Sequence, residues 1–271
     1  MQGLGNDFFV FDAPATPAQA RLVSRKLSAL ADRHTGVGFD QALMLEAGRD
    51  AKHRVFYRVF NADGTEAQQC GNGARCVAAH LYARAPHLGR DFSMENVGGT
   101  VHAKVHDDAS VSVDMGVPNF DPRALPLQAA AEADAYTLAI DGADVEIGAV
   151  SIGNPHAVLR VPDTKAAPVE ELGRSISNHA RFAARTNVGF MQVLGRDHIR
   201  LRVFERGVGE TLACGTGACA AVAVGRRQGL LDALVRVELP GGAASVSWQG
   251  PGERCWLTGP ATTVFTGSID I

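Results

Sequence analysis

Short apolar segments recur along the chain, many with alternating polar positions, and Gly, Pro or Asp residues separate them. This pattern predicts β-strands over residues 8–11, 54–60, 110–115, 136–140, 157–161, 198–204, 235–239 and 244–248. Two runs of small apolar residues, 77–81 and 220–224, indicate buried helices instead. A chain rich in strands, with few helices, predicts an α+β fold.

Two further helices are predicted where a proline opens a helical segment, since the fixed φ of proline suits the first helical position. In the first half of the chain, Thr16 is the expected N-cap and Pro17 the first helical residue. The apolar residues expected on one face of this helix are Val23, Leu27, Leu30 and Ala31. Pro168 is expected to open the corresponding helix in the second half.

The second half of the chain repeats the first. Residues 58–60 and 70–74, with sequences RVF and CGNGA, return 144 positions later as RVF and CGTGA. Upstream, residues 35–43 agree with 186–194 at six of nine positions. The polar or unequal pairs in this alignment are Asn6 with Asn154, Gly36 with Asn187, Gln41 with Gln192, Asn61 with Glu205, and Ala62 with Arg206. Matches in the same order at nearly equal offsets indicate a duplication.

Duplication predicts two pseudo-symmetric lobes, each a curved, barrel-like mixed sheet around a central helix. A linker is expected near residues 117–127, which gives an N-terminal lobe over 1–117 and a C-terminal lobe over 118–259. We expect the active site in the cleft between the lobes.

Composition narrows the class of partner. With 46% hydrophobic and 20% charged residues, a chain of 271 residues buries a substantial core. The net charge of −3, with neither sign clustered, argues against nucleic acid and anionic membranes as partners and favours a small molecule. No apolar run approaches the roughly 18 residues of a membrane span, and the N-terminal residues lack a signal-peptide pattern, so we expect a cytoplasmic protein.

Two of the five cysteines stand in a setting that activates thiols. The cysteines are Cys70, Cys76, Cys214, Cys219 and Cys255, with no paired CxxC for a metal and no dense disulfide framework. Cys70 and Cys214 lie at the expected starts of the buried helices, where unpaired N–H groups and the helix dipole stabilise a thiolate. The same N–H groups also suit a carboxylate ligand.

One such thiol suits acyl transfer, peroxide reduction or redox sensing, and a free cysteine is often only a small buried apolar residue. Two thiols related by duplication favour inversion of a stereocentre, because a base removes a proton from one face and an acid returns one to the other. The four lysines stand in no motif typical of a pyridoxal phosphate site. The sequence therefore predicts a cofactor-independent amino-acid racemase or epimerase.

The unmatched positions of the repeat predict how a symmetric site reads an asymmetric substrate. Arg206 is expected to bind a substrate carboxylate, and Glu205 to bind an ammonium group or tune the nearby thiol. The asparagines are expected to orient polar groups. Taken one at a time, the symmetric polar residues are equally well explained as turn formers or strand-end caps; they are Asn6 with Asn154 and Gln41 with Gln192.

Several segments together resemble the diaminopimelate epimerase family. They are GLGNDF (3–8), TGVGFDQ (35–41), NADG (61–64), CGNGARC (70–76), GNPH (153–156), NVGF (187–190), ERG (205–207) and ACGTGAC (213–219). The resemblance implies an isomerase that interconverts LL- and meso-2,6-diaminopimelate in lysine and peptidoglycan precursor biosynthesis. It further implies no cofactor or metal, a homodimer, and a last strand over 260–271 that returns to the first lobe.

Carried over by position, the resemblance assigns roles within the site. Cys70 is the base acting on the LL isomer and Cys214 the acid, with the roles exchanged in reverse, and His156 and Glu205 tune the thiol pKa values. The implied substrate contacts are Asn6, Gln41, Asn61, Asn154, Asn187, Glu205 and Arg206, with helix-start N–H groups from Gly71, Asn72, Gly215 and Thr216.

Two alternatives stay open at this point. One is a related racemase or epimerase acting on another amino acid, such as proline, hydroxyproline or histidine. The polar residues Asn61, Asn187 and Arg206 favour a substrate with a second amino-acid head, because unpaired buried polar groups cost about 1 to 3 kcal/mol each. The other alternative is a non-catalytic redox sensor that uses a disulfide between Cys70 and Cys214.

Overall fold

The computed structural model describes all residues except 15, 17–22, 24–25, 68–69 and 270–271. The chain divides into two compact units, Met1–Val113 with the segment from Gly259 onward (unit 1), and Asp114–Thr258 (unit 2).

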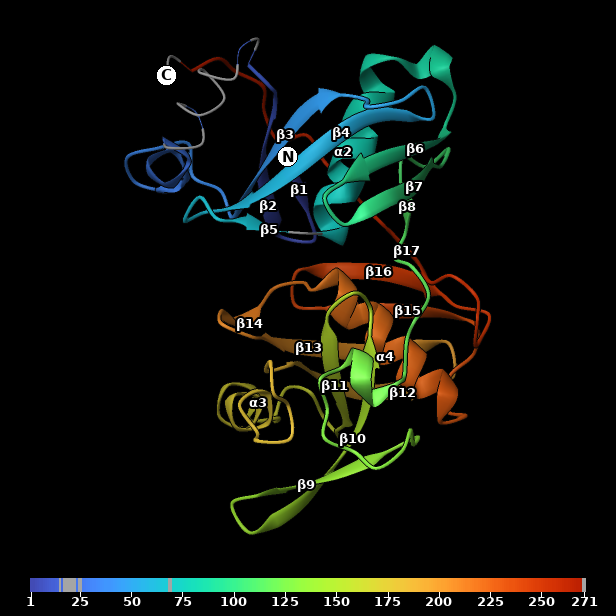
Figure 1. Ribbon diagram of the computed structural model, residues 1–271. Coiled ribbons are helices and arrows are strands. Elements are labelled where there is room, and N and C mark those ends of the chain that lie inside the picture. Colours follow the sequence, from blue (N-terminus) through green and yellow to red (C-terminus); the bar gives the residue numbers. More distant parts are fainter. Residues whose placement is uncertain (15, 17–22, 24–25, 68–69, 270–271) are drawn as a thin grey trace. The chain divides into compact units, whose positions relative to one another are not determined.

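Unit 1 is built from strands and one long helix (Figure 1). Its strands are β1 (Gln2–Gly3), β2 (Asn6–Asp12), β3 (Gln41–Ala47), β4 (His53–Asn61), β5 (Glu66–Ala67), β6 (Asp91–Asn96), β7 (Gly99–Val105) and β8 (Val111–Asp114, at the boundary). Helix α2 spans Gly71–Arg84 and a short 3₁₀ helix follows at Pro86–Leu88.

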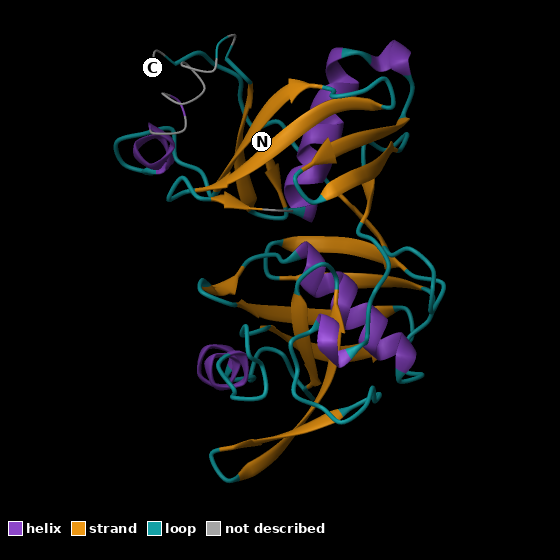
Figure 2. Ribbon diagram, in the orientation of Figure 1, coloured by secondary structure: helices purple, strands orange, loops and turns teal. Residues whose placement is uncertain are grey.

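Unit 2 is likewise built mainly from strands with one long helix (Figure 2). Its strands are β9 (Tyr136–Ile140), β10 (Ala143–Ser151), β11 (Pro155–Arg160), β12 (Asn187–Gly195), β13 (His198–Glu205), β14 (Gly209–Thr211), β15 (Leu234–Leu239), β16 (Gly242–Ser247) and β17 (Trp256–Gly259, at the boundary). Its helices are α3 (Val169–Ser177), α4 (Gly215–Arg227) and a 3₁₀ turn at Pro122–Ala124.

The strand pairings of the two units match, which agrees with the predicted duplication. In unit 1, β2–β3 is parallel, β3–β4 antiparallel, β4–β6 parallel and β6–β7 antiparallel. Unit 2 repeats this order in β11–β12, β12–β13, β13–β15 and β15–β16. The prediction of a mixed, sheet-dominated α+β fold is therefore confirmed.

Each sheet curves around its long helix. Helix α2 contacts β1, β2 and β7, and helix α4 contacts strands from β10 to β16, so strands distant in the sheet meet the same helix (Figure 1). Both helices are rich in Gly and Ala, which allows this close approach, and they are buried from Gly71 to Ala78 in α2 and from Gly217 to Gly225 in α4. In unit 1, a separate apolar cluster includes the predicted helix-face residues Val23, Leu27 and Ala31, with Leu30 beside it.

The structure corrects the upstream part of the repeat alignment. Phe8 stands opposite Gln41 in β2–β3, and His156 stands opposite Asn187 in β11–β12, so Gln41 rather than Gly36 is the equivalent of Asn187. Gln192 lies well inside the β12–β13 hairpin, opposite Arg200. The shared Val-Gly-Phe letters were misleading, because residues 37–39 form a loop before β3 whereas 188–190 lie within β12. The register of two strands is set by their hydrogen-bond pairing and by which side chains are buried, and not by identical residues in a sequence alignment.

Two other local predictions need correction. The segment predicted as a linker belongs to unit 2, where Leu125 is fully buried and Leu127 bridges Phe182. Pro168 is the N-cap of α3 and not its first helical residue.

Among the described residues after 259, the predicted returning strand is reduced to one bridge, between Thr262 and Gln2. Pro260 contributes to this, since proline has no N–H for a ladder. The predicted helix start at Pro17 lies outside the described residues.

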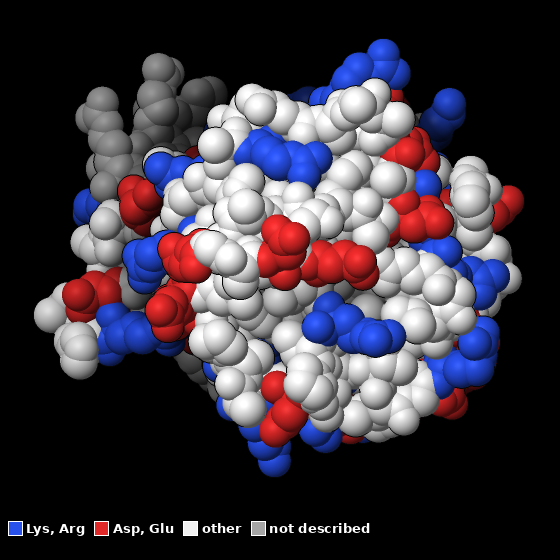
Figure 3. Space-filling model, turned by 90° about the horizontal axis from the view of Figure 1, so that it is seen from below, with Lys and Arg blue, Asp and Glu red and all other residues white. Residues whose placement is uncertain are grey.

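Surface charge is mixed. On the face drawn in Figure 3, acidic and basic side chains are interspersed, in line with the net charge of −3. Within the part of the chain that the structure describes, no helix has the length and apolar character needed to cross a membrane.

Candidate active site

Cys70 and Cys214 occupy the same position in the two units, as the N-cap residues of α2 and α4. Both have extended backbones, with φ −143° and ψ 111° at Cys70 and φ −118° and ψ 111° at Cys214. Each sulfur accepts a hydrogen bond from the backbone N–H three residues later, Gly73 at 3.4 Å and Gly217 at 3.3 Å. A helix start thus donates to each sulfur and stabilises negative charge on it.

In unit 1 the predicted amide residues gather at one end of the sheet. Asn6 begins β2, Gln41 begins β3 and Asn61 ends β4. Gln41 and Asn61 are register partners, and Gln41 Nε2 donates to Asn61 Oδ1 at 3.0 Å. The strand ends, rather than closeness in sequence, bring these side chains together.

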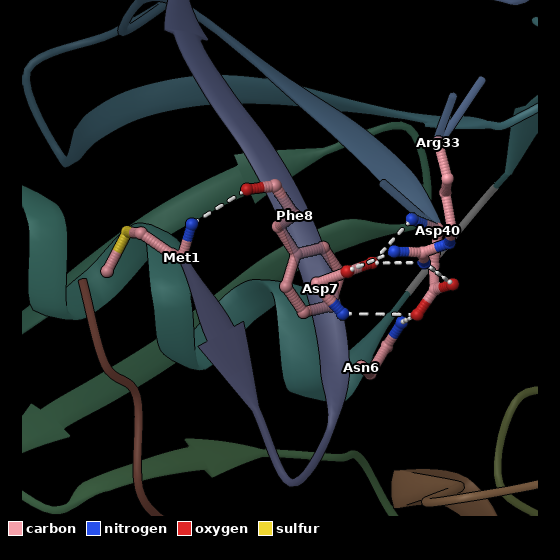
Figure 4. A network of polar contacts seen from close by, with 6 residues as sticks. All are labelled: Met1, Asn6, Asp7, Phe8, Arg33 and Asp40. Atoms are coloured by element: carbon pink, nitrogen blue, oxygen red, sulfur yellow. Dashed lines mark hydrogen bonds and ion pairs between the residues drawn. The ribbon is translucent and has the colours of Figure 1, made fainter. Parts of the chain in front are cut away.

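The Cys70 thiol belongs to a chain of amide hydrogen bonds. Its Sγ–H donates to Asn6 Oδ1 at 3.8 Å, and Asn72 Nδ2 donates to the same oxygen at 3.4 Å. Asn6 Nδ2 donates to Asp40 Oδ2 at 2.9 Å (Figure 4). This bond fixes the amide orientation of Asn6, so that its Oδ1 faces the thiol. Arg33 in turn forms an ion pair with Asp40 at 2.8 Å.

In unit 2 a similar series of side-chain hydrogen bonds ends at a histidine. Asn154 Nδ2 donates to Thr216 Oγ1 at 3.4 Å, and Thr216 Oγ1 lies 3.5 Å from Cys214 Sγ. His156 Nε2 lies 3.0 Å from Asn154 Oδ1. Because the Asn154 oxygen can only accept, Nε2 of His156 carries the proton in this contact.

His156 is neutral in this environment. It is fully buried, and burial, with a smaller contribution from the positive charge of Arg206, lowers its pKa from 6.5 to about 3. Its Nδ1 atom has no hydrogen-bond partner among the described residues. His156 therefore acts in unit 2 as a neutral N–H donor, and not as a charged group.

Glu205 lies beside the second thiol. Burial raises the pKa of its carboxyl group, while hydrogen bonds from the Thr211 hydroxyl and from Cys214 oppose that rise. The bond from Thr211 Oγ1 to Glu205 Oε1 is 2.6 Å long. A carboxylate that accepts from Cys214 favours the protonated thiol, because a thiolate would repel it.

Asn187 and Arg206 complete the unit 2 strand ends. Asn187 Oδ1 accepts the backbone N–H of Arg206 at 3.0 Å, and Asn187 Nδ2 donates to the Pro155 carbonyl at 3.3 Å. The exposed Arg206 guanidinium donates to the Ala184 carbonyl at 3.1 Å. Its remaining N–H groups suit a carboxylate ligand.

The other three cysteines are fully buried. Burial raises the pKa of Cys76 to about 12, which makes it a poor nucleophile. Across the described ranges, no group of three or more His, Cys, Asp or Glu side chains is arranged to hold a metal ion.

The model of the diaminopimelate epimerase family matches residues 1–120 and 148–264 of this chain. The chain belongs to the diaminopimelate epimerase family. It is 49% identical over 269 residues to the diaminopimelate epimerase of Stutzerimonas stutzeri, covering 99% of this chain and 97% of that protein. It is 52% identical over 271 residues to that of Halorhodospira halophila, covering 100% and 94%.

Solved structures of more distant proteins share the fold of this family member. A phenazine biosynthesis protein of Bacillus anthracis superposes with a TM-score of 0.65 at 16% identity, covering 96% of this chain and 92% of that chain. A probable proline racemase of Agrobacterium radiobacter gives a TM-score of 0.65 at 14% identity, with 99% and 92% covered.

Each thiol with its hydrogen-bonded neighbours forms a half-site: Cys70 with Asn6 and Asn72 in unit 1, and Cys214 with Thr216 and Asn154 in unit 2. Sequence reasoning did not find every residue that contacts these two half-sites. Asp40 orients Asn6, Thr211 binds Glu205, and Arg75 donates to Asn72 at 3.0 Å. Asp40 and Thr211 gave no sequence signal. Arg75 did, because an arginine among Gly and Ala in a helix otherwise expected to be buried is unusual.

Proposed function

We propose that the protein epimerises LL-2,6-diaminopimelate to the meso isomer without a cofactor, with Cys70 and Cys214 as the two acid–base residues. Family membership supports the substrate. The observation that carries the mechanism is the duplicated N-cap thiol, which receives a helix-start N–H in each unit.

In this mechanism the α-proton crosses from one face of the carbon to the other through two different thiols. The Cys70 thiolate removes the proton from the LL isomer and becomes a thiol. The Cys214 thiol delivers its own proton to the opposite face and becomes a thiolate. The backbone N–H groups at the two helix starts stabilise the charge that develops on the substrate carboxylate. These groups belong to Gly71 and Asn72 in α2 and to Gly215 and Thr216 in α4.

The remaining residues are proposed to recognise the second amino-acid head and to tune the thiols. Arg206 supplies a guanidinium for a carboxylate, while amides at the strand ends supply donors and acceptors for ammonium and carboxylate groups. Glu205, which accepts from Cys214, and His156, which orients Asn154, are proposed to set the protonation of the second thiol. A cytoplasmic location and a homodimer are part of this proposal.

The test is incubation of the reduced protein with LL-diaminopimelate in D₂O. Deuterium entry at one α-carbon together with meso isomer is the expected result. Proline, hydroxyproline and histidine serve as parallel substrates. Exchange with one of these, and none with diaminopimelate, would overturn the substrate and keep the chemistry. No exchange with any of them would overturn the enzymatic proposal in favour of a redox thiol protein.

A further inference from the structure

Helix α2 carries a buried arginine one turn from the Cys70 N-cap. Arg75 is 0% exposed and is among the largest fully buried side chains in the described part of the chain. Burying a guanidinium is costly unless hydrogen bonds and charges compensate. At the equivalent position of α4 stands Cys219, also 0% exposed. The helix core therefore does not itself require an arginine.

The guanidinium fits a slot between two glycines of unit 1. A Cβ atom at Gly3 would lie 3.3 Å from Arg75 Nη2, and one at Gly259 would lie 3.4 Å from Arg75 Cζ. Arg75 Nε donates to the Pro260 carbonyl at 3.4 Å. The first strand and the returning segment thus hold the side chain in place, and larger residues at either glycine would crowd it.

Arg75 also fixes the orientation of an amide in the Cys70 half-site. Nη2 donates to Asn72 Oδ1 at 3.0 Å, which leaves Asn72 Nδ2 to donate to Asn6 at 3.4 Å. A flipped Asn72 would face the guanidinium with its NH₂ group and the Asn6 oxygen with its own oxygen. Both contacts would be repulsive, so the arginine selects one orientation.

The positive charge of Arg75 is its second contribution to the Cys70 half-site. Tyr57 and Cys76 both interact electrostatically with Cys70, and burial raises the pKa of each, that of Cys76 to about 12. Both are therefore neutral at physiological pH. The positive charge of Arg75 opposes the rise in the pKa of the neighbouring Cys76. It adds to the helix-start N–H groups that favour anionic sulfur.

We propose that Arg75 is a positioning residue of the Cys70 half-site: it locks the Asn72 amide and favours the Cys70 thiolate, so that Cys70 is the better base. This inference rests on the proposed function for its catalytic meaning. The unit 2 half-site has no equivalent cation on α4 and orients its chain through His156.

The test compares Arg75→Met and Arg75→Lys with the wild type, and with Arg84→Met at the exposed far end of the same helix as control. Iodoacetamide alkylation of the Cys70 peptide is followed by mass spectrometry across pH. In Arg75→Met the midpoint pH of alkylation is expected to rise by roughly one unit. Arg75→Lys, which keeps the charge, is expected to hold the midpoint and raise KM. Arg84→Met is expected to change neither.

An unchanged midpoint in folded Arg75→Met would overturn the proposal. If circular dichroism shows that this variant does not fold, Arg75→Gln against Arg75→Lys provides the same contrast of charge, and equal midpoints would again overturn it. Alkylation needs no turnover. A shifted midpoint in a protein that fails to epimerise would overturn the proposed function alone, whereas an active enzyme with no shift would overturn the role of Arg75 alone.

Discussion

The two half-sites carry the same N-cap thiol and differ in what surrounds it. In unit 1, Cys70 and Asn72 share the oxygen of Asn6, and the chain of contacts ends on the buried cation Arg75. In unit 2, the chain runs from Cys214 through Thr216 and Asn154 to a neutral histidine, and a carboxylate lies beside the sulfur. After duplication, the helix start was kept and its supporting charges diverged.

This difference suits an enzyme whose two thiols need opposite protonation at the start of each turnover. We propose that the buried cation of α2 favours the thiolate at the first sulfur, against the Asn6 oxygen that accepts from it, whereas a carboxylate that accepts from the second sulfur favours the thiol. This difference supports the proposal that Cys70 is the base and Cys214 the acid for the LL substrate. Substitutions in either half-site can break this assignment, and the thiols themselves carry the largest expected effect.

Removing either thiol is expected to abolish epimerisation. Cys70→Ala and Cys214→Ala should each lower kcat by at least about 10³-fold, because each loses one obligatory proton transfer. Cys255→Ala, at a buried cysteine outside both half-sites, is the matched control and is expected to remain near wild type. Steady-state assays in both directions check this, and substantial activity in either catalytic variant would contradict two-thiol chemistry.

Neutralising Glu205 is expected to give the next largest loss of activity. Glu205→Gln keeps an acceptor for Thr211 but removes the negative charge beside Cys214. We expect kcat/KM to fall by about 10²-fold. It should fall by the same factor in both directions, because a catalyst cannot change the equilibrium between isomers. Glu210→Gln, which breaks the Arg202 ion pair on the neighbouring strand, is the control. Equal losses in both variants would count against a specific role for Glu205.

The sequence predicts some parts of the fold and of the two half-sites and not others. The thiols, their helix starts and the mixed sheets were predictable, because Gly-flanked motifs and alternating strands are local signals. The partners of the thiols were not. Gln41 was aligned with Gln192, although strand pairing makes it the equivalent of Asn187. The contact of Arg75 with Pro260 joins positions 185 residues apart, which local patterns cannot indicate.

Replacing His156 by Phe, the residue at the equivalent position in β2, tests the neutral histidine. Below the ordinary value of 6.5, the unfolded chain binds a proton here that the folded chain does not bind until about pH 3. The wild type therefore loses stability as pH falls through this window, by up to several kcal/mol. His156→Phe should reduce this loss, measured by urea unfolding at pH 7.5 and 5. Exposed His87→Phe should keep it, and an unaltered pH dependence in His156→Phe would argue against a buried neutral imidazole.

The smallest expected effect tests the corrected register. Gln41→Ala removes an amide at the strand end and is expected to raise KM for LL-diaminopimelate by about tenfold, the equivalent of one hydrogen bond of about 1.4 kcal/mol. Gln192→Ala removes contacts with Thr164 and Arg200 instead and should leave KM within about twofold. Similar rises in KM for Gln41→Ala and Gln192→Ala would favour the alignment drawn from sequence letters and count against the equivalence of Gln41 with Asn187.

The central claim, that two thiols act on opposite faces of one carbon, is tested most directly by labelling in the first few per cent of reaction. LL-diaminopimelate is mixed with reduced enzyme in D₂O, and product and residual substrate are analysed separately by mass spectrometry. Two thiols predict meso product with deuterium at the inverted carbon and residual substrate that is still unlabelled, because the delivered proton comes from the solvent-equilibrated Cys214. Early product that retains the substrate hydrogen would mean that one base carries the proton across, and would contradict the account.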